Sequence, residues 1–140
     1  MKQRRGTSGR EVTVDTSKCA LAKWSGAEDR CRWCDRALTG RARVWCSVAC
    51  ARSWSENHAW TAARLAALEA SGYSCHECGS GLVLEVHHIK APSGGRKRYG
   101  NGCWNHQDRL VVLCEVHHAA LTRLERARPG PLQLRLPVAS

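Results

Sequence analysis

The chain of 140 residues contains no phenylalanine and only two tyrosines. Without these large side chains, and with few unbroken runs of Val, Ile and Leu, a large conventional core is difficult to build. Small domains of this kind usually depend on disulfides or structural metals. The length fits one compact domain or two very small ones, and the scarcity of large apolar residues favours two.

Long apolar runs are also missing. No segment approaches the roughly 20 apolar residues that a membrane-spanning helix needs, and the first residues, MKQRRGTSGREVT, contain no apolar core of a secretory signal. We therefore expect an intracellular, cytoplasmic protein. In that reducing compartment, paired cysteines are more often metal ligands than disulfides. The odd number of cysteines, nine, also favours metal, and zinc is the expected ion.

Basic residues outnumber acidic ones, with 22 Lys and Arg against 12 Asp and Glu and a formal net charge of +10. A basic surface attracts polyanions and speeds their capture. Charge alone is equally compatible with simple solubility, but combined with zinc sites it favours a nucleic-acid partner.

The sequence divides into four segments and predicts a small α+β, zinc-stabilised fold. Residues 1–18 form a flexible basic arm, and residues 127–140 form a Pro-rich tail. Residues 19–70 form a four-Cys zinc finger with a connecting helix, predicted over 51–70 and ended by Ser71 and Gly72. Residues 71–126 carry predicted strands at 82–89 and 110–113 and a helix at 115–126, with a long Gly-rich loop at 90–108.

Two groups of potential zinc ligands stand out by their spacing. The first has four thiols within a short window and should be structural, because four thiolates leave no open position on the ion. Its members are Cys31, Cys34, Cys46 and Cys50. Cys19 lies outside this pattern and is expected to be a spare thiol. The second group contains Cys75, Cys78 and Cys114, with either His117 or His118 as fourth ligand and Cys103 as a competitor. No spacing argument assigns a role to His58, His76 or His106, which are expected to be non-catalytic.

The second group surrounds further histidines in a recognisable order. CHEC at 75–78 is followed by EVHHI at 85–89, then by LVVLCEVHH at 110–118 and by Thr122. This combination resembles the HNH endonucleases of the ββα-metal fold. The resemblance covers roughly residues 73–123.

The resemblance implies a role for each of these histidines. His88 is the implied general base that activates water, as suits an imidazole with an ordinary pKa of about 6.5. His87 and His118 are the implied ligands of a catalytic divalent metal, Mg²⁺ or another ion. His117 occupies the place of the family's fourth zinc-binding Cys. Separately, the strand period of two places Glu85 on the same face as His87, where it could orient that ligand.

One position departs from the family pattern. Arg109 precedes Leu110 where family members usually have Asn, and Asn101 or Asn105 are candidate substitutes. The basic residues of this region are expected to contact DNA phosphates, although a solvated charge run is the simpler alternative. They are Lys90, Arg96, Lys97, Arg98 and Arg109.

The expected function is therefore metal-dependent hydrolysis of DNA phosphodiester bonds. The resemblance makes a phage or bacterial host cell the natural setting, with a packaging terminase or other mobile-element proteins as partners beside DNA. The alternative is a non-catalytic zinc-finger protein that binds nucleic acid with a degenerate HNH fold.

Overall fold

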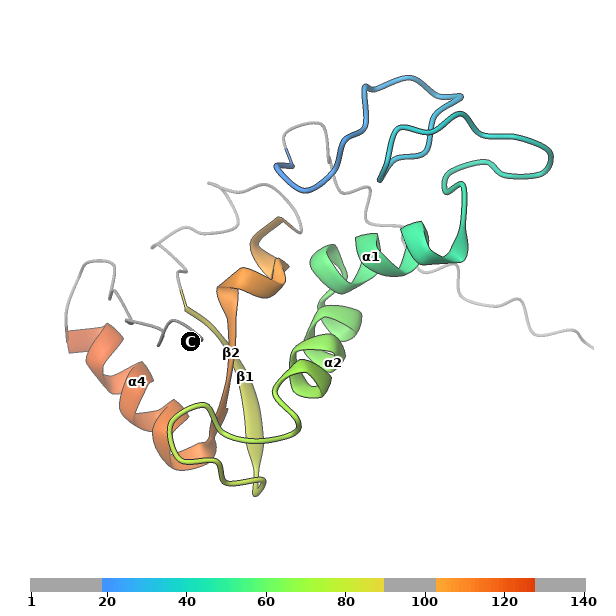
Figure 1. Ribbon diagram of the computed structural model, residues 1–140. Coiled ribbons are helices and arrows are strands. Elements are labelled where there is room, and N and C mark those ends of the chain that lie inside the picture. Colours follow the sequence, from blue (N-terminus) through green and yellow to red (C-terminus); the bar gives the residue numbers. More distant parts are fainter. Residues whose placement is uncertain (1–18, 90–102, 128–140) are drawn as a thin grey trace, which may run out of the picture.

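A computed structural model describes residues 19–89 and 103–127 of the chain. The predicted arm therefore lies outside the described residues, as does the predicted tail except for its first residue, Ala127, which is helical. Lys90, Arg96, Lys97, Arg98 and Asn101 also lie outside the described residues. The small α+β class is confirmed, with three α-helices and one two-stranded sheet in the part described (Figure 1). None of these helices is long and apolar enough to cross a membrane.

The elements follow one another in a simple order. Helices α1 (Val48–His58) and α2 (Trp60–Ala70) come first, followed by strand β1 (Leu84–His88). Two short 3₁₀ turns, η1 (Cys103–Asn105) and η2 (Gln107–Arg109), lead into strand β2 (Leu110–Cys114) and helix α4 (Glu115–Ala127). The first strand is shorter than predicted, since Leu82 and Val83 are exposed and Val83 has a positive φ of 46°.

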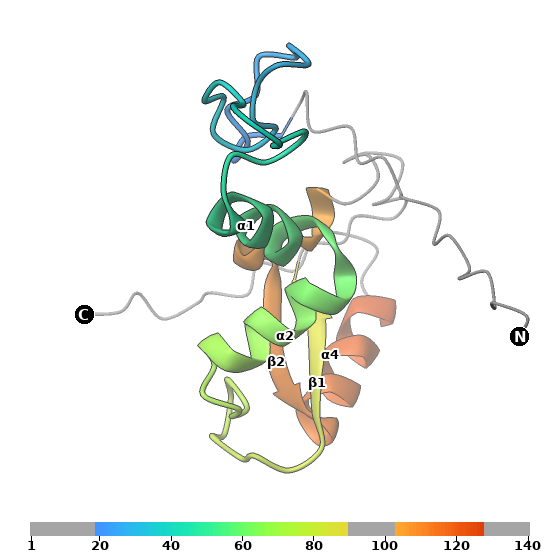
Figure 2. The same ribbon diagram turned by 90° about the vertical axis from the view of Figure 1, so that its right-hand side faces the viewer.

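The sheet is antiparallel and lies between two helices. His88 pairs with Leu110 at one end and Leu84 with Cys114 at the other, and Figure 2 shows α2 and α4 on either side. All five residues of β2 are buried, and their side chains alternate between the two faces. Leu110 and Val112 pack with Ala63, Ala67 and Leu68 of α2, whereas Val111 and Leu113 pack with Leu121 of α4.

The single helix predicted over 51–70 is wrong, because the chain breaks at Ala59. That residue has extended backbone angles, φ −87° and ψ 118°. Neither Gly nor Pro occurs there, so the cause is tertiary: the His58 carbonyl accepts a hydrogen bond from Asn105 Nδ2 at 2.9 Å. The predicted end at Ser71 and Gly72 is confirmed, with Ser71 as the C-cap and Gly72 at φ 62°.

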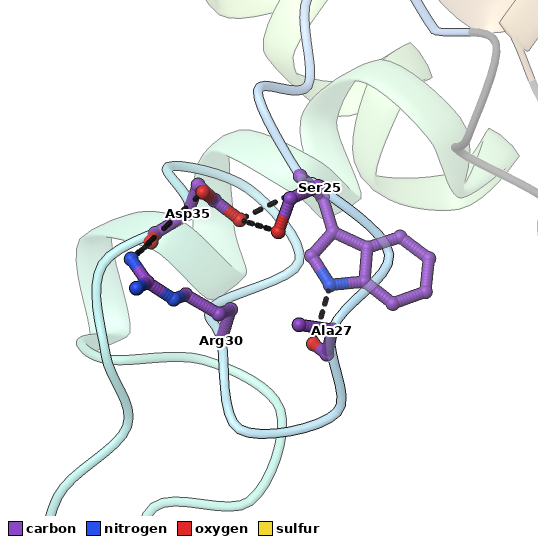
Figure 3. Close-up of polar contacts among 5 residues, drawn as sticks. Ser25, Ala27, Arg30 and Asp35 are labelled. Atoms are coloured by element: carbon purple, nitrogen blue, oxygen red, sulfur yellow. Dashed lines mark hydrogen bonds and ion pairs between the residues drawn. The ribbon is translucent and has the colours of Figure 1, made fainter.

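The segment before α1 is held by turns and side-chain hydrogen bonds, which Figure 3 shows around Asp35. Asp35 Oδ1 accepts from the backbone N and the Oγ of Ser25, at 2.8 and 2.6 Å. These bonds lower the pKa of the Asp35 carboxyl. Arg30 Nη1 donates to the Asp35 carbonyl at 3.1 Å, and Trp24 Nε1 donates to that of Ala27. The carboxylate of Asp35 thus connects this part of the chain to Ser25, ten residues earlier.

Candidate functional site

The first predicted ligand group comes together as a compact cluster. Cys31, Cys34, Cys46 and Cys50 place their sulfurs within 4.8 Å of one another. Cys46 Sγ lies 3.5 Å from that of Cys34 and 3.6 Å from that of Cys50. Ligands on one tetrahedral ion with bonds of about 2.3 Å are separated by about 3.8 Å. Four thiols at these distances could hold one metal ion.

The electrostatics of this first cluster also favour a bound cation. Burial opposes ionisation of Cys31, but backbone hydrogen bonds to Cys34, Cys46 and Trp33 outweigh it and lower its pKa to about 6. The pKa of Cys46 rises to about 12, chiefly because of its hydrogen bonds with Cys34 and Cys50. Without an ion the cluster thus resists accumulating negative charge, whereas a divalent cation would stabilise several thiolates at once.

The second cluster consists of Cys75, Cys78, Cys114 and His117. His117 Nδ1 lies 3.2 Å from the sulfur of Cys114 and 3.7 Å from that of Cys75, and the sulfurs of Cys78 and Cys114 are 3.9 Å apart. The hydrogen bond with Cys114 raises the pKa of His117. Of the two candidate histidines, His117 therefore completes this cluster, and His118 does not belong to it.

A third cluster was not predicted from the sequence. Cys19, His58, Cys103 and His106 are all buried and place their ligand atoms within 4.8 Å of one another. Cys19 Sγ lies 3.3 Å from His58 Nε2 and 3.4 Å from His106 Nε2, and the two imidazole nitrogens are 3.3 Å apart. Cys19, expected to be a spare thiol, lies in this cluster. Cys103 belongs here and does not compete for the second cluster.

The surroundings of the two histidines in this third cluster lower their pKa values and favour the neutral form. Burial lowers the pKa of His58, and burial together with the nearby His58 lowers that of His106 to about 4. His58 Nδ1 lies 2.8 Å from the carbonyl oxygen of Trp54. Because a carbonyl only accepts, Nδ1 carries the proton and Nε2 keeps its lone pair. That lone pair faces the cluster.

His87 and His118, the predicted ligands of the catalytic metal, lie side by side with ring centroids 5.1 Å apart. His87 Nε2 contacts Glu125 Oε1 at 3.0 Å, while His118 Nδ1 contacts Glu85 Oε2. The idea that Glu85 orients His87 is therefore wrong: Glu125 of α4 takes that place, because α4 packs on this face of the sheet. Within 19–89 and 103–127, the pair belongs to no cluster of three or more ligands.

His88 lies on the opposite face of β1, since side chains alternate along a strand. Its imidazole is stacked between Trp60 and Trp104, at centroid distances of 5.0 and 4.1 Å. His88 Nε2 lies 3.0 Å from Asn105 Oδ1. Burial lowers the pKa of His88 and outweighs the hydrogen bond with Asn105, which raises it.

The Asn105 amide determines which nitrogen of His88 carries the proton. Its Nδ2 donates to the His58 carbonyl at 2.9 Å, so its Oδ1 must face His88. An amide oxygen only accepts, and Nε2 of His88 is therefore the protonated nitrogen. The lone pair is on Nδ1, as a general base requires. Of the two asparagines considered as substitutes for the family residue, Asn105 thus contacts the predicted base.

No protein-family model, curated protein or solved structure matches the chain.

Arg109 is the one predicted DNA-contacting residue among those described. It is half-buried, and its Nη1 donates to the Cys103 carbonyl at 3.2 Å. Its backbone carbonyl accepts from the N–H of Ile89 at 2.8 Å, one residue beyond the paired strands. Part of this guanidinium is thus engaged within the protein, beside the third cluster.

Proposed function

We propose that the protein is a zinc-stabilised, metal-dependent endonuclease of the HNH type, with a ββα-metal domain that hydrolyses DNA phosphodiester bonds. The first two clusters hold structural zinc, in keeping with their four-Cys and three-Cys-one-His donor sets. His88 is the general base, and His87 and His118 are the ligands of a catalytic divalent ion such as Mg²⁺.

The observation that carries this proposal is the state of His88. Asn105 Nδ2 donates to the His58 carbonyl, and Asn105 Oδ1 accepts from His88 Nε2–H, which leaves the lone pair of His88 on Nδ1. Burial lowers its pKa, which favours the neutral imidazole that a general base requires. An imidazole prepared in this way can remove a proton from the water that attacks phosphorus.

The histidine pair on the other face supports the proposal in a second way. His87 and His118 are each oriented by a carboxylate, as metal-binding histidines usually are. Two protein ligands leave several positions for water and phosphate oxygens. A divalent ion bound there supplies charge neutralisation at the phosphate. The net charge of +10 favours capture of DNA.

One observation favours a second candidate, a protein that binds nucleic acid without cutting it. His88 is stacked between two indole rings and lies on the face of β1 opposite His87. An imidazole in this position also serves as a packing element of the core. On this second candidate, DNA binding requires neither Mg²⁺ nor His88.

Conversion of supercoiled plasmid to nicked or linear DNA distinguishes the two. Zinc-loaded protein is assayed with Mg²⁺, Mn²⁺ or EDTA, alongside His88→Ala, His88→Asn and a control, His76→Ala, at an exposed histidine outside all three clusters. We expect metal-dependent cleavage by the wild type and the control, and its loss in both His88 variants with zinc content and helicity unchanged. Intact plasmid under every metal, with DNA still shifted on a gel, refutes the nuclease and supports the binding protein.

A further inference from the structure

We propose that Cys19, His58, Cys103 and His106 bind a third zinc ion, which joins the two halves of the protein and fixes Trp104 and Asn105 against His88. The zinc site is inferred from its own geometry. Its significance for His88 as a base rests on the proposed function.

The donor set and its spacing fit one tetrahedral ion. Two thiolates and two imidazoles form a closed Cys₂His₂ shell, a common structural zinc site. With bonds of about 2.3 Å to sulfur and about 2.0 Å to nitrogen, tetrahedral geometry separates two nitrogens by about 3.3 Å and a sulfur from a nitrogen by about 3.5 Å. The corresponding distances are 3.3 Å between His58 and His106, and 3.3 and 3.4 Å from Cys19.

The surroundings of His58 provide an independent observation. Metal-binding histidines usually donate their second N–H to a carbonyl or carboxylate, which orients the ring and leaves the other nitrogen for the ion. His58 Nδ1 makes this bond to the Trp54 carbonyl at 2.8 Å. Trp54 also stacks on the ring at 5.1 Å, and Trp33 contacts it edge-on at 6.1 Å. The imidazole is thus held with Nε2 directed at the other ligands.

The cysteine inventory agrees with a third ion. The nine cysteines of the chain divide without remainder among the three clusters, as four, three and two. None of the nine forms a disulfide in the structure. A buried group of two thiols and two imidazoles without an ion would have to be satisfied by weak hydrogen bonds among themselves.

The ligands come from parts of the chain that are far apart in sequence. Cys19 and His58 belong to the N-terminal segment, and Cys103 and His106 belong to the turns before β2. The sequence separations from Cys19 are 39 residues to His58 and 87 to His106. An ion bound here therefore connects the four-Cys unit to the unit that carries the sheet.

The same ion would determine the position of the residues that contact His88. Trp104 and Asn105 are the two residues between the ligands Cys103 and His106. Asn105 also bonds the carbonyl of His58, a third ligand. An ion that fixes these ligands also fixes the Trp104 indole that stacks on His88 and the Asn105 amide oxygen that accepts a hydrogen bond from its Nε2–H.

The first test is the zinc content of the full chain by native mass spectrometry after removal of loosely bound metal. We expect three zinc ions per chain for the wild type and for His76→Ala. Two ions in the wild type overturn the proposal without any variant. Cys19→Ser and His106→Ala should each hold two, and a variant that still holds three contradicts the assigned ligands.

The second test measures the positioning of His88 by NMR of its ring nitrogens, which distinguishes the tautomers. We expect the Nε2-protonated form in the wild type. In Cys19→Ser, which changes a ligand from a different segment of the chain, we expect exchange between both tautomers. Retention of one fixed tautomer in a variant that has lost its third zinc refutes the positioning role. Both readouts are independent of DNA cleavage, so an inactive protein with three zinc ions and a fixed tautomer refutes only the proposed nuclease.

Discussion

Replacing Asn105 with alanine tests the polar connection between the third cluster and His88. The side chain is only 5% exposed and makes two hydrogen bonds, at 2.9 Å to the His58 carbonyl and at 3.0 Å to His88 Nε2. Asn105→Ala removes both hydrogen bonds at once. It leaves a buried carbonyl and a half-buried imidazole N–H without their amide.

The magnitude follows from these two groups. Each buried polar group left without a partner costs about 1–3 kcal/mol, so the two together should lower the free energy of unfolding by about 2–6 kcal/mol. For a small domain this is a large part of the total stability of about 5–15 kcal/mol. His88 should also lose its fixed tautomer, because no amide oxygen then accepts a hydrogen bond from Nε2–H.

Urea unfolding followed by tryptophan fluorescence, at a fixed free zinc concentration, measures this change. The matched control is Asn57→Ala. Asn57 is half-buried, donates to the Ser53 carbonyl at 2.9 Å and accepts from Gln107 N at 3.2 Å. Its loss should cost about 1 kcal/mol, because water can replace these partners. A loss of stability in Asn105→Ala no greater than in the control would refute the reasoning.

Three further predictions concern the core, a turn and the metal sites. Leu113→Ala should cost about 2–5 kcal/mol, because the side chain is 2% exposed between β2 and α4; Leu82→Ala, 77% exposed, should change stability by less than about 0.5 kcal/mol in the same denaturation assay. Gly72→Ala should cost about 1 kcal/mol through its φ of 62° alone, since a Cβ there meets nothing within 4 Å; an unchanged melting temperature would contradict this. Burial opposes ionisation of Cys31 and Cys75, but backbone hydrogen bonds lower both pKa values to about 6. Because zinc binds deprotonated thiols, zinc retained in equilibrium dialysis should fall as the pH is lowered, and full retention at pH about 4 would contradict this.

The parts of the fold that are local in sequence could be predicted from it. The closely spaced Cys pairs identified the first two clusters, because a Cys-x₂-Cys turn brings its two sulfurs together regardless of the rest of the chain. The strand and helix of the C-terminal unit were predicted to within a few residues by their apolar patterns. The HNH fold and the catalytic roles stay predictions.

The third cluster could be found only in part by spacing, since Cys103 and His106 have the same Cys-x₂-His spacing as Cys114 and His117. Its ligands come from three segments, and neither Cys19 nor His58 has a partner nearby in sequence. Two signals were available: this Cys-x₂-His pair, and the two cysteines that remained after the first two groups were complete. The break at Ala59 was missed for a related reason, since the Asn105 amide that accompanies it lies more than forty residues away in sequence. Both features depend on tertiary contacts, which local propensity does not contain.

The unequal spacing of the ligands has a consequence for the order in which the protein is assembled during synthesis. The first cluster is complete once Cys50 has left the ribosome, so a short nascent chain can already bind its ion. The cluster beside His88 needs His106, and the second needs His117. A half-made chain can therefore possess a finished N-terminal finger while the histidines of the C-terminal unit are still without their neighbours. Any activity that depends on His88 would therefore appear only after His106 has been synthesised and has joined Cys19 and His58.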